Sequence, residues 1–167
     1  MDASQPHCPA VGFQRDGNIA CFPDRESLIR TDSWTLKTGD YDGMELVDAC
    51  GASWRVRAVK LLGRDGPLWR RPIDFICGYG FHIELDLEPL PPVPFRELVE
   101  RICRTAAAHP DFFYDEEIGA GEGRLEPLDW PVQFAHLTGR LRRAADLREI
   151  CAIIDDPCDG ILPDSKN

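Results

Sequence analysis

The pattern of apolar and polar positions is clearest between residues 81 and 88. Four apolar side chains there alternate with four polar ones: Phe81, Ile83, Leu85 and Leu87 against His82, Glu84, Asp86 and Glu88. A period of two predicts a strand with one buried and one exposed face. Residues 18–22, 44–47 and 54–62 also have the composition of strands, and residues 73–77 are a candidate for a further one. Gly51 suits a hairpin loop between the second and third of these segments, because glycine accepts a positive φ.

Helical spacing dominates the second half of the chain. Residues 95–108 place a stripe on one side of a predicted helix, formed by Phe95, Leu98, Val99, Ile102 and Cys103. Glu97–Arg101 and Glu100–Arg104 are predicted ion pairs on its exposed side. Two short helices are expected near residues 24–30 and 31–39, and another from residue 130 onward. A last helix begins near Asp146, which forms a capping-box pattern with Glu149.

This order of elements predicts an α+β fold. Strands in the first half and helices in the second indicate a mainly antiparallel sheet of about four strands, packed on one face by about three or four helices. The length of 167 residues suits one domain. We therefore expect a flexible leader over residues 1–12, a single domain over residues 13–156 and a frayed tail over residues 157–167.

Composition narrows the class of protein. The chain carries 29 acidic and 19 basic residues, a net charge of −10. Such a balance argues against binding to nucleic acid or to anionic membranes and favours a basic partner. The chain has 7 cysteines with no C-x-x-C spacing, which fits neither a zinc ribbon nor a disulfide framework and predicts a cytoplasmic protein. Neither a metal nor a cofactor is predicted, and no apolar run approaches the length of a membrane span.

The charges are sorted along the chain, with bases concentrated in residues 53–71 and acids in residues 109–129. On the predicted strands, His82, Glu84 and Asp86 share a face, and so do Arg55 and Arg57. One interpretation is that the two strands are neighbours and that their charges form cross-strand ion pairs. The other is a site for an anionic small molecule in a pocket between sheet and helices, in which the carboxylates act as acid and base.

Two segments are candidate partner-binding surfaces. A loop tryptophan beside two arginines, Trp69, Arg70 and Arg71, is typical of a recognition element, although a buried loop anchor has the same composition. The acidic segment Tyr114, Asp115, Glu116 and Glu117 suits docking to a basic protein, although charge runs are also typical of solvated surface. No catalytic residue is predicted, because the sequence holds neither an H-E-x-x-H nor a G-x-S-x-G motif.

Several segments in the middle of the chain carry a resemblance: Asn18-Ile-Ala-Cys-Phe-Pro23, Asp42-Gly-Met-Glu-Leu-Val-Asp48, Trp54-Arg-Val-Arg57 and Glu84-Leu-Asp-Leu-Glu-Pro89. In these segments, the chain resembles small uncharacterised bacterial proteins of α+β fold. In size, acidity and layout it is similar to immunity proteins that neutralise bacterial toxins.

The acidic charge, the sorted charged segments with their aromatic residues and the lack of catalytic motifs favour a non-enzymatic protein-binding protein that acts on a basic partner. The similarity to immunity proteins implies an immunity-type or regulatory role. The alternative is a small enzyme or ligand-binding domain. A third reading, nucleic-acid binding through residues 53–71, is disfavoured by the net charge.

Overall fold

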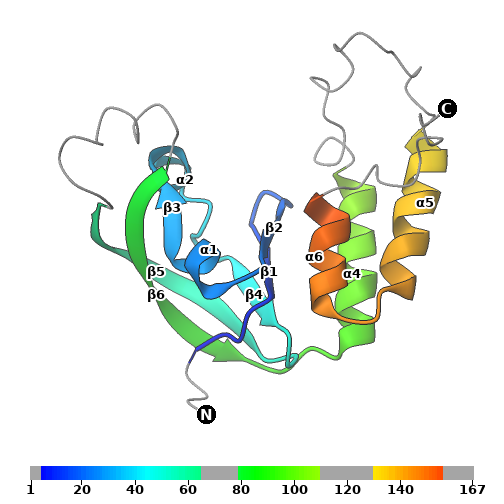
Figure 1. The fold of residues 1–167 in the computed structure, drawn as a ribbon, viewed down its shortest axis with the longest axis horizontal. Coiled ribbons are helices and arrows are strands. Elements are labelled where there is room, and N and C mark those ends of the chain that lie inside the picture. Colours follow the sequence, from blue (N-terminus) through cyan, green and yellow to red (C-terminus); the bar gives the residue numbers. More distant parts are fainter. Residues whose placement is uncertain (1–4, 65–78, 110–129, 156–167) are drawn as a thin grey trace, which may run out of the picture. The chain divides into compact units, whose positions relative to one another are not determined.

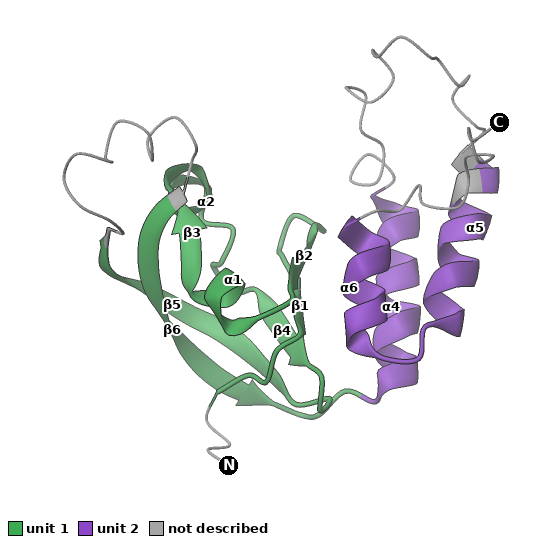
Figure 2. Cartoon of the chain, viewed as in Figure 1, with its two compact units in different colours: residues 1–93 green, residues 94–167 purple. Residues whose placement is uncertain are grey.

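The computed structural model describes residues 5–64, 79–109 and 130–155. The chain divides into two compact units, residues 1–93 and residues 94–167 (Figure 2). Within these described ranges, the first unit holds a curled β-sheet with two short helices, and the second holds three longer helices (Figure 1). The α+β class is therefore confirmed, whereas the expectation of one domain over residues 13–156 differs from this division.

The sheet contains six antiparallel strands in the order β2-β1-β4-β5-β6-β3. Their bounds are Ala10–Phe13 for β1, Ile19–Phe22 for β2, Arg30–Asp32 for β3, Glu45–Asp48 for β4, Ser53–Arg64 for β5 and Tyr79–Leu90 for β6. The strands β5 and β6 are 12 residues long, whereas the others have three or four. The sheet is therefore built around one long β5–β6 ribbon.

The chain connection between the two outermost strands requires the sheet to curl. The helix α1 (Arg25–Ile29) joins β2 at one end of the sheet to β3 at the other. Across six strands spaced about 4.8 Å apart, a flat sheet would separate these ends by about 24 Å. The segment from Phe22 to Arg30 spans only about 18 Å, because its five helical residues rise about 1.5 Å each. The curl in Figure 1 follows from this short connection.

The core of the first unit lies on one face of this curled sheet. Strand side chains provide most of it, and α1 and the turn before β4 add Leu28 and Tyr41; the other members are Ala10, Phe22, Met44, Leu46, Trp54, Val56 and Ile83. Gly12 belongs to the same face, and a Cβ at this position would stand 2.6 Å from the Met44 sulfur. A larger residue at position 12 would therefore displace the Met44 side chain in the core.

Helix ends in the first unit follow local sequence signals. Asp24 caps α1 through a capping box with Ser27. The helix α2 (Ser33–Thr38) is capped by Asp32, whose carboxylate accepts the N–H groups of Trp34 and Thr35, and it ends at Gly39 with φ of 74°. The predicted helix over residues 31–39 is thus confirmed, with its cap one residue later than Thr31.

The described part of the second unit contains α4 (Phe95–Ala108), α5 (Trp130–Arg143) and α6 (Leu147–Asp155). Its buried side chains include four members of the stripe predicted for residues 95–108. The buried set contains Leu98, Val99, Ile102 and Cys103 of α4, Leu137 and Leu141 of α5, and Ile150, Cys151 and Ile154 of α6. Glu100 on α4 bonds Arg142 on α5 rather than the expected Arg104, with a 3.0 Å contact to Nε. Asp146 accepts the N–H of Glu149, as the capping-box pattern predicts.

Several sequence predictions need correction. The sheet has six strands rather than about four, because β1 and β3 were not predicted. The leader over residues 1–12 is wrong for its last part, since Ala10 and Val11 are fully buried in β1. The strand β6 continues through Pro89 to Leu90, beyond the predicted strand over residues 81–88. Phe95 is 39% exposed and does not join the buried stripe of α4.

Among the helices within the described ranges, none combines the length and apolar character needed to cross a bilayer.

Candidate functional site

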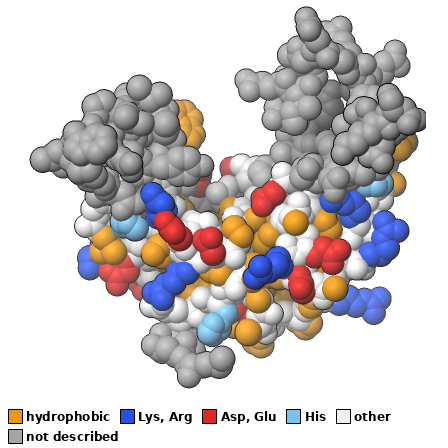
Figure 3. Space-filling model, viewed as in Figure 1, with side chains coloured by type: hydrophobic (Ala, Val, Ile, Leu, Met, Phe, Trp, Pro, Cys, Tyr) orange, Lys and Arg blue, Asp and Glu red, His pale blue; other side chains and the backbone are white. Residues whose placement is uncertain are grey.

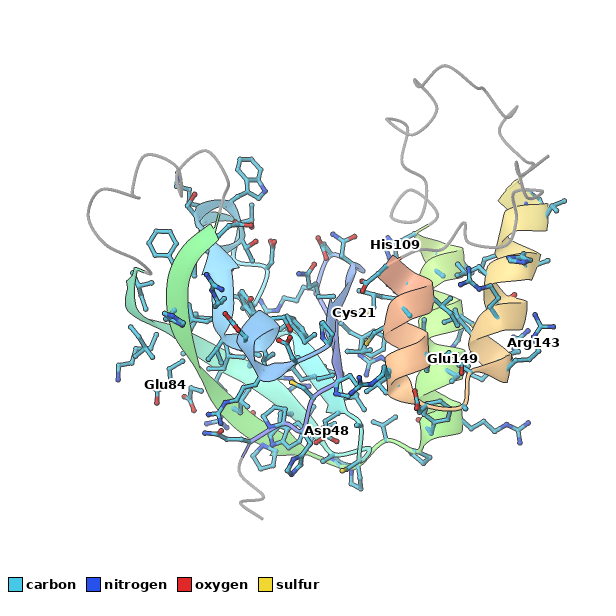
Figure 4. The ribbon with its side chains drawn as sticks, in the orientation of Figure 1. Cys21, Asp48, Glu84, His109, Arg143 and Glu149 are labelled. Carbon is cyan, nitrogen blue, oxygen red and sulfur yellow. The ribbon has the colours of Figure 1, made fainter. Side chains whose placement is uncertain are left out.

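The β5–β6 ribbon carries a row of ion pairs on its outer face. Arg57 on β5 contacts Glu88 on β6 at 2.7 Å, and Lys60 contacts Glu84 at 3.3 Å. Glu84 points away from the sheet in Figure 4. In Figure 3, acidic and basic side chains lie next to one another on the left, where β5 and β6 run in Figure 1. The alternation of β6 therefore serves a face on which opposite charges are matched across strands.

Arg55 shows how a base on β5 behaves when it has a strand on either side. It stands directly opposite Glu45 of β4, and its guanidinium bonds that carboxylate at 2.9 Å. This hydrogen bond and the charge of Glu45 raise the pKa of Arg55, and Glu88 on β6 acts in the same direction. Arg55 is thus flanked by acids from both neighbouring strands. Glu88 also accepts a hydrogen bond from Arg57, which lowers the pKa of Glu88.

These contacts show how the predicted acidic face of β6 and the predicted basic face of β5 are related. Cross-strand ion pairing between the two strands is confirmed, with Lys60 as a partner that sequence reasoning did not name. Asp86 stands opposite Ala58, and His82 opposite Gly63. The ion pairs account for the charge of Arg57 and Glu84 without a ligand, and the anionic-ligand site stays a prediction. Within the described ranges, no group of three or more potential ligands could hold a metal ion.

The seven residues predicted for partner binding, Trp69, Arg70, Arg71, Tyr114, Asp115, Glu116 and Glu117, lie outside the described residues.

Within the described residues, one edge of β5 has no neighbouring strand along much of its length. The neighbour β4 pairs only with Ser53, Trp54 and Arg55, and the last contact on that side joins the backbone of Val56 to Met44 and Gly43. From residue 57 to residue 64, β5 pairs with β6 alone among the strands that the structure describes. We call this stretch the β5 edge. Its backbone groups on the side away from β6 form a row that another strand can extend.

The side chains of the β5 edge divide between the two faces of the sheet. Lys60 lies on the outer face with Glu84, whereas Val59 and Leu61 stand opposite Leu85 and Ile83 on the face that carries the core. The register shifts beside Val56 and again after Leu61, so the edge is flanked by two bulges. Leu61 and Leu62 are 54% and 58% exposed. The β5 edge therefore presents bases on one side and uncovered apolar surface on the other.

Sequence reasoning did not identify the β5 edge, although a signal was present. The predicted strand over residues 54–62 is about twice as long as its predicted hairpin partner over residues 44–47. In an antiparallel hairpin, the longer strand extends beyond the shorter one and leaves its far half without that partner.

Comparisons with protein-family models, with curated proteins and with solved structures find no match to this chain.

Proposed function

We propose that this protein is a non-enzymatic protein-binding module that uses the β5 edge as its binding surface. The observation that carries the proposal is the open backbone of residues 57–64 together with two leucines that are more than half exposed, Leu61 and Leu62. Strand addition to an open edge is a recurrent way in which proteins bind extended polypeptides.

The chemistry of the β5 edge favours a polypeptide over a small molecule. A strand edge offers N–H and C=O groups at a regular spacing of about 3.4 Å per residue, which an extended chain matches along its whole length. The charged groups beside the edge are held in ion pairs, Arg57 with Glu88 and Lys60 with Glu84, on an exposed face. This arrangement supports recognition of a protein more than acid–base chemistry on a substrate.

The more specific roles are also proposals. An immunity-type or regulatory role, and a cytoplasmic site of action, rest on the sequence resemblance and on the cysteine pattern. A basic partner for the acidic residues 111–126 rests on their charge. That contact is separate from the β5 edge, whose own charged residues are basic.

Site-directed photo-crosslinking in cells that produce the protein tests the proposal. A photoreactive amino acid replaces Leu62 on the edge or, as the control, exposed Lys37 on α2, a helix that contacts β3 and β6. We expect a discrete adduct with another protein at position 62 and none at position 37. Absence of any adduct at position 62, or the same adducts at both positions, would refute a binding role for this edge.

A further inference from the structure

We infer that the partner adds an extended segment to the β5 edge as a new strand, in line with β4, and that this segment alternates acidic with apolar residues. The inference rests on the proposed function and specifies the chemistry of the partner. In the completed sheet, the acids would lie on the outer face opposite the bases of β5, and the apolar residues would cover Leu61 on the other face.

The first support is the part of β5 that already has a neighbour on this side. There, β4 places Glu45 opposite Arg55 on the outer face and Leu46 opposite Trp54 in the core. The incoming segment would occupy the same side of β5, immediately beyond β4. It would therefore meet the same alternation of base and apolar side chain, with Lys60 and Leu61 in the places of Arg55 and Trp54.

The second support is the strand on the opposite side of the edge. Residues 81–88 of β6 alternate apolar with polar side chains, three of which are acidic, and pair with the same stretch of β5. Glu84 meets Lys60, while Ile83 meets Leu61. This stretch of β5 thus already pairs with one strand of the proposed composition, namely β6, along its opposite side.

The bases of the edge keep the capacity to meet a second acid. The Lys60 side chain is 74% exposed and its contact to Glu84 is 3.3 Å long. Such exposed pairs are weak and mobile, so the ammonium group can be shared between carboxylates on two strands. Arg55 demonstrates the shared arrangement, since Glu45 and Glu88 both act on it.

A second copy of this chain fits the edge poorly. Residues 57–64 contain Arg57, Lys60 and Arg64 and no acid. Two such strands paired antiparallel would bring bases next to bases, and like charges across strands are destabilising. Bulges and lysine on an edge are also the usual means of preventing edge-to-edge association. Pairing of two β5 edges is therefore disfavoured, and the occupant that we propose is an acidic segment of another protein.

A synthetic peptide tests this inference on the full-length protein. The probe has the sequence of residues 81–88, and the control peptide has lysine at its three acidic positions. We expect the acidic probe to bind at least tenfold more tightly than the control and to weaken as salt is added. Residue-resolved hydrogen exchange should show that those amides of residues 57–64 that face away from β6 exchange fast in the free protein and slowly with the probe bound.

Protein variants supply the second arm of the test. Lys60→Glu reverses a charge on the edge, and Lys37→Glu makes the same change of net charge on α2. We expect Lys60→Glu to weaken probe binding at least fivefold and Lys37→Glu to leave it within twofold of wild type. Equal effects of the two variants would show that net charge, rather than the edge, controls binding.

Other outcomes overturn the inference without touching the proposed function. Slow exchange of these amides in the free protein would show that the edge is already paired. Equal binding of both peptides would remove the acidic specificity. If position 62 crosslinks to a partner but these amides stay unprotected in that complex, the protein binds partners at this surface by another mode. If position 62 gives no adduct, the proposed function itself fails.

Discussion

The carboxylate of Asp48 anchors the turn between β4 and β5, and its replacement by asparagine should destabilise the first unit. The side chain is 2% exposed. One oxygen accepts the N–H groups of Cys50 at 2.8 Å and Ala52 at 3.0 Å, and the other accepts the N–H of His7 at 2.9 Å. It thereby ties the chain ahead of β1 to the turn that starts β5 (Figure 4).

The magnitude follows from what an amide can still accept. In Asp48→Asn, one oxygen can keep its two bonds, but the amide nitrogen meets the N–H of His7, a donor facing a donor. Loss of a bond to a charged group costs about 1.5–3 kcal/mol. The two remaining bonds become neutral ones and weaken, which adds about 1 kcal/mol. We expect a loss of about 2–4 kcal/mol in the free energy of unfolding of the first unit, which is large beside a typical total of about 5–15 kcal/mol.

Native-state hydrogen exchange of the full chain measures this loss, because it reports on each unit separately. Amides in β4 and in the paired half of β5 should exchange about 30- to 700-fold faster in the variant, at about 1.4 kcal/mol per tenfold change. Asp42→Asn, which removes an exposed carboxylate from a neighbouring turn, is the control and should change stability by less than about 0.5 kcal/mol. Exchange rates in Asp48→Asn within threefold of wild type would refute the reasoning.

Three further predictions concern the second unit and the cysteines. The hydrogen bond from Arg142 lowers the pKa of Glu100 below its ordinary value of 4.5, so the pair stabilises the fold at neutral pH and loses its effect as the pH falls below 4.5. Thermal unfolding should therefore show Glu100→Gln slightly below wild type at pH 7, with a difference that shrinks as the pH falls below 4.5. Burial raises the pKa of the Cys103 thiol, so iodoacetamide followed by peptide mapping should find exposed Cys50 alkylated and Cys103 protected until unfolding. Gly139→Ala within α5 should raise stability by about 0.5–1 kcal/mol in chemical denaturation, because the new Cβ meets nothing closer than 3.9 Å.

The elements that the sequence predicted well are those with a strong local signal. The helix over residues 95–108 matches α4 at both ends, because its apolar stripe and the preceding Pro94 define it locally. Likewise, the alternation of residues 81–88 identified the centre of β6. The loop with Gly51 is confirmed with φ of 77°, a conformation that favours glycine.

The elements that were missed depend on contacts far along the chain. The strand β1 is buried along its whole length, so it shows no alternation, and it contains a glycine. The strand β3 consists of Arg30, Thr31 and Asp32, whose composition does not favour a strand, and its conformation comes from pairing with β6. The bulge beside Val56 places exposed Ala58 on the outer face opposite Asp86, whereas strict alternation from Trp54 would have placed it on the core face.

Of the candidate site, only the matching of opposite charges between two strands was predictable from the sequence. Matching bases to the acids of β6 required no more than the two strand faces, and Arg57 with Glu88 confirms the principle. The individual pairs were not predictable, because the register and the bulge decide that Lys60 rather than Arg55 meets Glu84. An open edge is a property of the whole strand order, which short-range patterns do not contain.

The composition of the β5 edge bears on whether the edge only resists aggregation or also binds a partner. Lys60 and the flanking bulges are what a strand needs to remain unpaired in solution. Leu61 and Leu62 are not, since they stay more than half exposed. Complete burial of a leucine is worth about 1.5–3 kcal/mol, so covering the exposed halves of both would yield roughly 2–3 kcal/mol. An edge that only resisted aggregation could carry polar residues at these two positions without losing buried apolar surface. The bases disfavour pairing of two β5 edges, whereas burial of the leucines would stabilise a complex. This combination is the one expected of an edge that binds an acidic strand.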